Sequence, residues 1–246
     1  MASWSRDEIL IAYALYCVTP LSKINPSNKT IQQVAPMIGH SVSSLVLRMR
    51  NFQSLDPAAP NGMAHVAKAD KSIYEEFCHD WGTLSLAAET LTGLALFDSS
   101  PLQGAKPLSS LTDRNKVSRE RAFFRQSVRA VYDGKCYISG CALPGILVAS
   151  HIKPFSSCRD ENERTTPENG IYFNTFYDRA FDTGLMTITP DRKARISPIV
   201  KDLAKDEFTK VWLLALDGQT LPSVNRFAPR KEFLEYHNDM IFKKAV

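Results

Sequence analysis

The stretch that decides the fold is CYISGCALPGILVASHIKPF at residues 136–155, together with NGIYFNTFYDRAFDTGLMTI at residues 169–188. The apolar run in the first part predicts a strand over residues 146–152 that ends in Ser-His-Ile-Lys-Pro. A polar, charged loop follows at residues 156–168. The Asn-Gly pair that opens the second part predicts a turn into a short strand over residues 171–173. The sequence therefore predicts two strands joined by a long polar loop.

The second part continues into a helix, which we expect to begin over residues 176–181. Asp178 and Asp182 are four residues apart and so share one face of that helix. The first strand ends at His151, whose imidazole, with an ordinary pKa near ~6.5, can accept a proton at pH 7. Two Asp oxygens completed by water suit a hard cation, so the expected cofactor is Mg²⁺ or Mn²⁺. A base and a hard cation together are what hydrolysis of a phosphodiester requires.

These residues resemble the HNH, or ββα-metal, endonuclease family, in the subgroup common among bacterial restriction-type proteins. The similarity covers about residues 118–243. The resemblance implies two catalytic residues, His151 as the general base and Asn169 as the residue that ties the loop together. It also implies that Asp178 and Asp182 bind one divalent metal ion and that double-stranded DNA is the substrate.

Two positions depart from the pattern of this family. Ser150 precedes the base, where relatives often carry a metal-ligating Asp or His, and Tyr177 stands where many relatives carry His. Three functions stay open: a restriction-type endonuclease, a nuclease that cuts only methylated or otherwise modified DNA, and a DNA-binding protein with a degenerate HNH scaffold. The resemblance favours the first.

The N-terminal part of the chain predicts a helix-turn-helix. A capped helix over residues 4–16 is followed by TIQQVAPMIG, which stops at Gly39, and by SSLVLRMRNF at residues 43–52. Over residues 3–57 this order resembles the helical domain found ahead of nuclease modules in restriction enzymes. The last helix would then present the following residues to DNA: Ser43, Ser44, Arg48 and Asn51. A three-helix structural bundle is the alternative.

The predicted fold class is α+β, with an N-terminal helical, helix-turn-helix-like domain at residues 1–97 and a C-terminal ββα-metal HNH nuclease domain at residues 113–246. Residues 98–112, rich in Ser and Pro, form the predicted linker. Two short helices are expected ahead of it, at residues 70–82 and 84–96. After it, a basic helix over residues 114–132 and the nuclease motif supply further predicted DNA contacts: Arg121, Arg125, Arg129, Lys153 and Arg179. For the basic helix, a merely solvated charged face is the alternative.

The composition fits such a protein without proving it. The 246 residues are 44% hydrophobic and 23% charged, which excludes disorder as the main state. The net charge of +4 permits a polyanionic partner. No apolar run is long enough for a membrane span, and five cysteines without framework spacing predict a reducing cytoplasm. Cys136 and Cys141 have no second pair, so we expect no structural zinc.

The motif occurs once in the chain, and one base with one metal hydrolyses one strand at a time. Cutting both strands therefore predicts a homodimer, whose two-fold symmetry would match a palindromic site. Apolar side chains after residue 198 are candidates for its interface, among them Phe208, Val211 and Trp212. Covering the core of the nuclease module is their alternative role.

Overall fold

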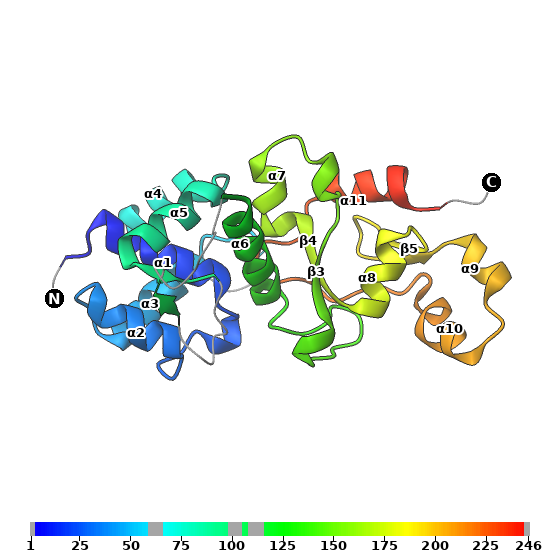
Figure 1. Cartoon of the computed structure of the whole chain (residues 1–246), viewed down its shortest axis with the longest axis horizontal. Coiled ribbons are helices and arrows are strands. Elements are labelled where there is room, and N and C mark those ends of the chain that lie inside the picture. The colour runs from blue at the N-terminus through cyan, green and yellow to red at the C-terminus, as the bar shows by residue number, and fades with distance from the viewer. Residues whose placement is uncertain (1–2, 59–65, 98–104, 108–115, 244–246) are drawn as a thin grey trace.

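The computed structural model describes residues 3–58, 66–97, 105–107 and 116–243, arranged as Figure 1 shows. The first part is mainly helical, and the second part combines helices with short two-stranded sheets, so the predicted mixture of helix and strand is confirmed. The elements of the first part are α1 (Arg6–Val18), the 3₁₀ helix η1 (Leu21–Lys23), α2 (Lys29–Met37), α3 (Val42–Gln53), α4 (Lys68–Phe77), α5 (Trp81–Thr92), β1 (Leu94–Ala95) and β2 (Lys106–Pro107).

Side-chain caps decide where these helices begin. The Ser5 hydroxyl accepts from the Glu8 amide while the Glu8 carboxylate accepts from the Ser5 amide, a complete capping box at the start of α1. Asp80 accepts from the Thr83 amide at 3.2 Å and so starts α5 at Trp81. The helix predicted over residues 70–82 is therefore wrong at its end, because α4 stops at Phe77 and Trp81 belongs to the next helix.

The predicted helix, short turn and helix are present as α2 and α3. Gly39 lies between them with φ +71°, a backbone conformation that favours glycine. Ser41 caps α3 by accepting from the Ser44 amide at 3.1 Å. The apolar side of α3 is buried through Leu45, Val46, Met49 and Phe52.

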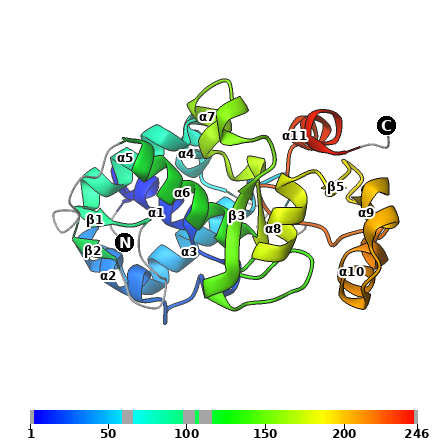
Figure 2. The same ribbon diagram turned by 45° about the vertical axis from the view of Figure 1, so that its right-hand side comes forward.

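The second part of the chain is built around an antiparallel hairpin. Strands β3 and β4 pair with His151 opposite Gly170, and in both ribbon views β3 lies between α6 and α8 (Figures 1 and 2). The elements of this part are α6 (Lys116–Val131), η3 (Pro144–Ile146), β3 (Leu147–His151), η4 (Phe155–Ser157), α7 (Glu161–Thr165), η5 (Pro167–Asn169), β4 (Gly170–Asn174), α8 (Thr175–Asp182), β5 (Met186–Ile188), β6 (Ala194–Ile196), α9 (Pro198–Leu203), α10 (Glu207–Trp212), η6 (Leu214–Leu216), α11 (Lys231–Tyr236) and the π-helix η7 (His237–Ile241).

The strand–strand–helix order predicted around the motif is confirmed, with one correction. The stretch expected to be loop at residues 156–168 contains α7 and flanking 3₁₀ turns. Gly170 has an extended backbone, so no left-handed turn explains it. Instead, a Cβ at Gly170 would lie 2.2 Å from Val128 Cγ2, so the glycine lets α6 pack directly on the hairpin.

Helix α6 belongs to both hydrophobic cores of the molecule. Ala122 and Phe123 pack into the core of the N-terminal helices, while Phe124 and Val128 pack into the core of the hairpin. The predicted linker at residues 98–112 therefore precedes a helix that joins the two cores. Of this linker, residues 106–107 form β2, which pairs with β1, and most of the rest lies outside the described residues.

The C-terminal segment extends the second part of the chain and returns to the N-terminal core. Leu213, Phe233 and Leu234, which belong to the apolar side chains after residue 198, are buried in the hairpin core and so cover the module itself. Arg226 is fully buried and donates to the carbonyl oxygens of Tyr16 and Thr19, both at 2.7 Å, at the end of α1. Over the described ranges, no helix is both long and apolar enough to cross a membrane.

Candidate active site

His151 closes β3 and is held on three sides. Its ring stacks on Phe124 of α6, with centroids 3.7 Å apart, and meets the Phe155 ring edge-on. Its Nε2 donates to the Arg164 carbonyl oxygen at 3.0 Å, which leaves Nδ1 as the unprotonated nitrogen. Burial lowers the pKa of His151, and the nearby Arg121 charge lowers it further. The imidazole is therefore neutral at pH 7, as a general base must be.

Asp178 and Asp182 lie one turn apart on α8, facing the hairpin. The Ser150 hydroxyl donates to Asp182 Oδ1 at 3.4 Å, which ties β3 to this helix. Burial raises the pKa of Asp178, which is partly buried. Asp182 keeps more exposed surface, and partial burial together with the negative charge of Asp178 raises its pKa as well. The two carboxylates thus repel each other across one short stretch of helix.

These side chains line one pocket of about 450 Å³ between the hairpin, α8 and the C-terminal segment. Successive strand residues point to opposite faces, so Ser150 contacts α8 while His151 contacts α6. Both nevertheless border the pocket, together with Asp178 and Asp182. The structure therefore brings together the predicted base and both predicted metal ligands.

The carboxylate pair fits a hard divalent cation. Oxygen ligands are what Mg²⁺ and Mn²⁺ prefer, and a cation would offset the repulsion between the two acids. Within the described ranges, no group of three or more His, Cys, Asp or Glu side chains is arranged around one metal position. Asp178 and Asp182 would thus supply two ligands, and water or substrate oxygens would supply the others.

Asn169 braces the loop that follows the base and does not line the pocket. It is fully buried; its Oδ1 accepts from the Lys153 amide at 2.8 Å, and its Nδ2 donates to the carbonyl oxygens of Lys153 and Glu163. These bonds fix both ends of the loop that carries Arg164, the hydrogen-bond partner of His151. Asn169 therefore acts through the loop and has no contact with the reacting groups.

The two departures from the family pattern have structural explanations. Tyr177 is 3% exposed and its hydroxyl donates to the Trp212 carbonyl oxygen at 3.0 Å, so its side chain packs toward α10. Ser150 is buried against Asp182, as described above. One pocket residue escaped the sequence analysis: His237 of η7, fully buried and stacked on Phe181 at 3.6 Å. Its late position in the chain gave no signal that it reaches α8.

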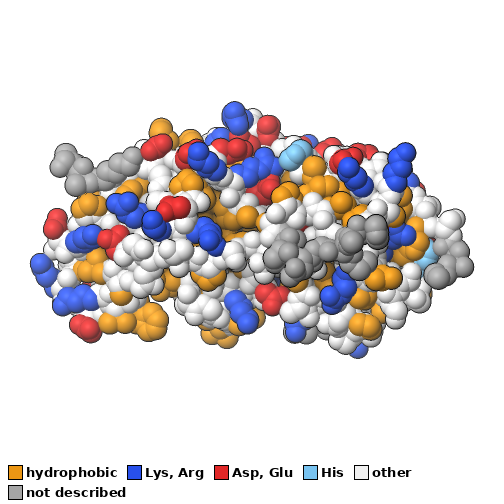
Figure 3. All heavy atoms as spheres, turned by 180° about the vertical axis from the view of Figure 1, so that it is seen from behind, with side chains coloured by type: hydrophobic (Ala, Val, Ile, Leu, Met, Phe, Trp, Pro, Cys, Tyr) orange, Lys and Arg blue, Asp and Glu red, His pale blue; other side chains and the backbone are white. Residues whose placement is uncertain are grey.

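Lys153, one of the predicted DNA contacts, is held by an acid of the same segment. Its side chain is 10% exposed, and its Nζ donates to Glu163 Oε2 at 2.6 Å, so the charge is neutralised inside the protein. Arg121 and Arg125 of α6 and Arg179 of α8 are exposed, and Arg129 is partly exposed. On the face opposite to Figure 1, the described Lys and Arg side chains are scattered among Asp and Glu (Figure 3).

Arg48 and Asn51 of α3, two further predicted DNA contacts, are partly exposed and are held by an acid of another helix. Asp70 of α4, which is fully buried, forms an ion pair with Arg48 and accepts from Asn51 Nδ2 at 3.1 Å. Trp4 covers the Arg48 guanidinium, with Cζ 4.6 Å from the ring centroid. Ser43 is exposed and Ser44 is partly exposed. Of the four side chains predicted to contact DNA from α3, only the serines stand free of Asp70.

Comparison with known families agrees with this geometry. Residues 136–189 match the family model of the HNH endonucleases. The matched segment of HNH type contains the hairpin, α8 and β5, and it includes His151, Asn169, Asp178 and Asp182. This match supports a nuclease, hence a hydrolase with DNA as its substrate, of a kind that commonly uses a divalent metal. No curated protein matches the chain.

Proposed function

We propose that this chain is a metal-dependent DNA endonuclease of the restriction type. The observation that carries the proposal is the shared pocket of His151, Asp178 and Asp182 inside the segment that matches the HNH endonucleases. The pocket joins a neutral base to a carboxylate pair suited to a hard cation. This combination favours hydrolysis of phosphodiesters over mere binding of DNA.

In the proposed reaction, Nδ1 of His151 takes a proton from the water that attacks the phosphorus. The Arg164 carbonyl oxygen keeps the ring proton on Nε2, and Phe124 keeps the ring in one orientation. A divalent cation bound to Asp178 and Asp182 would neutralise charge on the phosphate and on the leaving oxygen. Asn169 keeps Arg164 in place and so maintains the hydrogen bond that orients the base.

The N-terminal helices are the proposed selecting part, with α2 and α3 as a helix-turn-helix unit. Arg48 forms an ion pair with Asp70, and Asn51 donates a hydrogen bond to it. Ser43 and Ser44 at the start of α3 are therefore the remaining candidates for contacts to DNA from this helix. Arg125, Arg129 and Arg179 are proposed contacts to the DNA backbone. Magnesium or manganese as the metal, and a homodimer as the form that makes double-strand breaks, belong to the same proposal.

The test is cleavage of supercoiled plasmid in the presence of Mg²⁺ or Mn²⁺. Methylated and unmethylated plasmids are compared, and the fragment ends are sequenced. We expect wild-type protein to cut and His151→Ala to cut roughly 10²–10⁴ times more slowly, the usual cost of losing a general base. His79→Ala is the matched control, since His79 is an exposed histidine that contacts Arg230 and does not line the pocket of His151.

Near-normal cleavage by His151→Ala would contradict the assignment of the base. Cutting of methylated plasmid alone would establish the modification-dependent alternative. Binding of DNA by the wild type without any metal-dependent nicking would establish the degenerate scaffold. Cleavage that persists in EDTA would exclude the one-metal reaction.

A further inference from the structure

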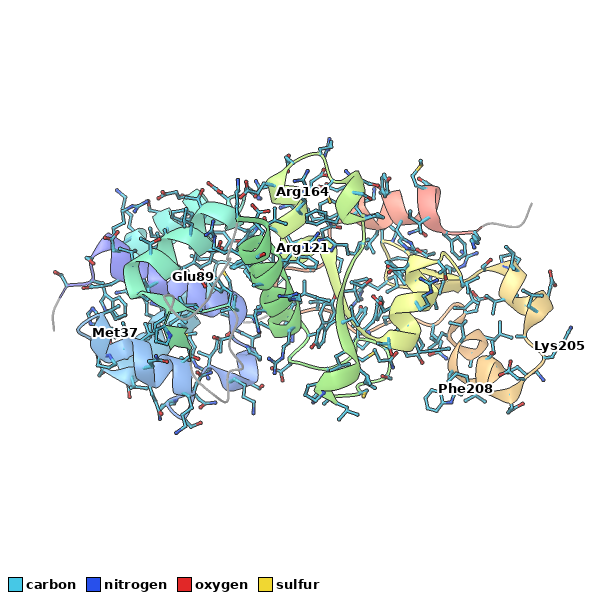
Figure 4. All side chains as sticks on the ribbon, in the orientation of Figure 1. Met37, Glu89, Arg121, Arg164, Lys205 and Phe208 are labelled. Carbon is cyan, nitrogen blue, oxygen red and sulfur yellow. The ribbon has the colours of Figure 1, made fainter. Side chains whose placement is uncertain are left out.

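Two arginines from different helices share one aromatic ring beside the base. Arg121 of α6 and Arg164 of α7 place their guanidinium carbons 5.0 and 5.3 Å from the centroid of the Phe155 ring. That ring lies 5.9 Å from the His151 ring, centroid to centroid. Figure 4 shows both arginines in the middle of the molecule, Arg164 above Arg121. Phe155 lines the pocket next to His151, so two cationic side chains lie against one ring of the pocket wall.

Three basic side chains nearby form ion pairs with an acid, whereas Arg121 and Arg164 form none with a described residue. Lys153 and Arg159 both bind Glu163, and Lys116 binds Glu161. Within the described ranges, no carboxylate lies within 4.0 Å of the Arg121 or Arg164 guanidinium. Arg164 Nε is in addition buried without a hydrogen-bond partner. The Arg164 charge also acts on the buried Glu120 carboxyl, whose pKa it lowers, but over more than ion-pair distance. An aromatic ring holds a guanidinium in place and leaves its N–H groups available to an anion.

Arg164 is also joined to the base through its backbone. Its carbonyl oxygen accepts from His151 Nε2 at 3.0 Å, while its side chain lies against Phe155. An anion held by this guanidinium would consequently sit at a fixed distance from the imidazole. A guanidinium matches the oxygens of a phosphate with two parallel hydrogen bonds, and two of them would surround one phosphate group.

We propose that Arg121 and Arg164, held by Phe155, form a clamp for a backbone phosphate of the DNA strand being cut, beside the scissile phosphodiester. This inference rests on the proposed function and specifies how the substrate is placed against His151. The contact is to the backbone and carries no sequence information, so it fixes the register of the strand for any sequence. Arg121 is one of the DNA contacts that the sequence predicts, and Arg164 is an addition to them.

The test measures binding of a labelled mixed-sequence DNA duplex in EDTA, so that no cleavage occurs. Arg121→Gln and Arg164→Gln are each expected to weaken binding roughly tenfold or more and to lower the slope of log K against log salt by about 1. Lys71→Gln on α4, a 63% exposed lysine, is the control for loss of one charge and should match the wild type. Arg164→Lys keeps the charge and the stem, so it should keep the slope and still lose affinity.

Wild-type affinity and slope in both glutamine variants would overturn the clamp. So would wild-type affinity in Arg164→Lys, because a point charge would then be sufficient. Melting temperatures are measured alongside, and the lysine variant decides the question if a glutamine variant folds poorly. A wild type that never cuts DNA, but whose binding depends on both arginines, would refute the proposed nuclease and leave the clamp standing.

Discussion

At the scale of single residues, the carboxylates of α8 offer a test that needs no cleavage. If Asp178 and Asp182 bind one divalent ion, saturating Mn²⁺ should stabilise the wild type, by about 2.7 kcal/mol at roughly 100 times Kd. Asp178→Asn and Asp182→Asn should each lose this gain, because each removes one of the two charged ligands. Thermal melting with and without metal measures it. Asp202→Asn, an exposed acid in α9, should keep the gain, and an equal gain in all variants would contradict the site.

His237 carries a prediction about the pH dependence of stability. Its Nε2 donates to the Phe181 carbonyl oxygen at 3.2 Å and its Nδ1 accepts from the Thr187 hydroxyl at 2.8 Å, an arrangement of the neutral ring. Burial lowers the pKa of His237 from 6.5 to about 4. The unfolded chain therefore binds more protons between these pH values. The contribution of neutral His237 to the free energy of unfolding is fully present above about pH 6.5. It is lost as the pH falls toward 4, by about 3 kcal/mol in all.

Urea unfolding of wild type and His237→Gln, each at pH 7.5 and pH 5, measures this contribution. The variant should have a lower free energy of unfolding than the wild type at pH 7.5. The difference between the two proteins should be smaller at pH 5. Other acids titrate in both proteins and cancel in the difference. A gap of equal size at both pH values would show that His237 contributes packing alone.

Single residues also show what the sequence could predict. That His151, Asp178 and Asp182 border one pocket could be predicted, because they lie in one short motif that resembles the HNH family and the helix period places both carboxylates on one face. The partners of Lys153, Arg48 and Asn51 could not be predicted, because each is held by a buried acid, Glu163 or Asp70, from another element. An ion pair between different elements leaves no pattern in the local sequence. A basic side chain that forms such a pair therefore cannot be distinguished, from the sequence alone, from one that does not.

At the scale of elements, Asp70 joins α4 to α3 and should be costly to remove. Asp70→Asn keeps the shape but leaves the Arg48 guanidinium, only 15% exposed, without its counter-charge. Breaking a buried pair from one side costs about 3–5 kcal/mol, so we expect a loss in that range on chemical unfolding. Glu75→Gln on the same helix breaks only the exposed pair with Lys71 and should cost less than about 1 kcal/mol.

Equal, small losses in both variants would contradict the structural role of Asp70. The same pairing alters the expectation for α3: Arg48→Ala should destabilise the N-terminal helices before it changes any preference for DNA sequence. Melting temperature and DNA binding measured on the same preparation separate the two effects.

Element boundaries were predictable where caps and apolar periods coincide, as in α1 and α3. Helix α7 was not, because Glu-Asn-Glu-Arg-Thr has no apolar face to reveal it. Its stability comes from Asp160, which caps it at 2.9 Å, and from Asn169, which binds the Glu163 carbonyl oxygen from outside the helix. A helix that is stabilised by such hydrogen bonds has no apolar period, so the sequence predicts a loop there.

At the scale of the whole molecule, the two hydrophobic cores are connected more closely than the predicted linker at residues 98–112 suggests. Helix α6 supplies side chains to both, and Arg226 caps α1 from more than 200 residues away. Contacts over such separations leave no pattern in a single sequence, which is why residues 98–112 read as a boundary. The parts proposed to select and to cut DNA thus share helix α6, and DNA bound to one part would be held in register with the other.

The exposed apolar side chains at the end of the molecule carry the last prediction, on the dimer. Leu203, Phe208, Val211 and Trp212 of α9 and α10 are about half exposed or more, an unusual cluster for a surface that stays in water. One base and one carboxylate pair cut one strand per engagement, so a second copy docked through this cluster would supply the other cut. Phe208→Glu should then slow linearisation of supercoiled plasmid and let nicked circles accumulate. Met37→Glu, an equally exposed apolar residue at the opposite end (Figure 4), should behave as the wild type does. Light scattering on the DNA complex completes the test: a monomer that nicks first and linearises later would show that two successive visits, and no dimer, make the double-strand break.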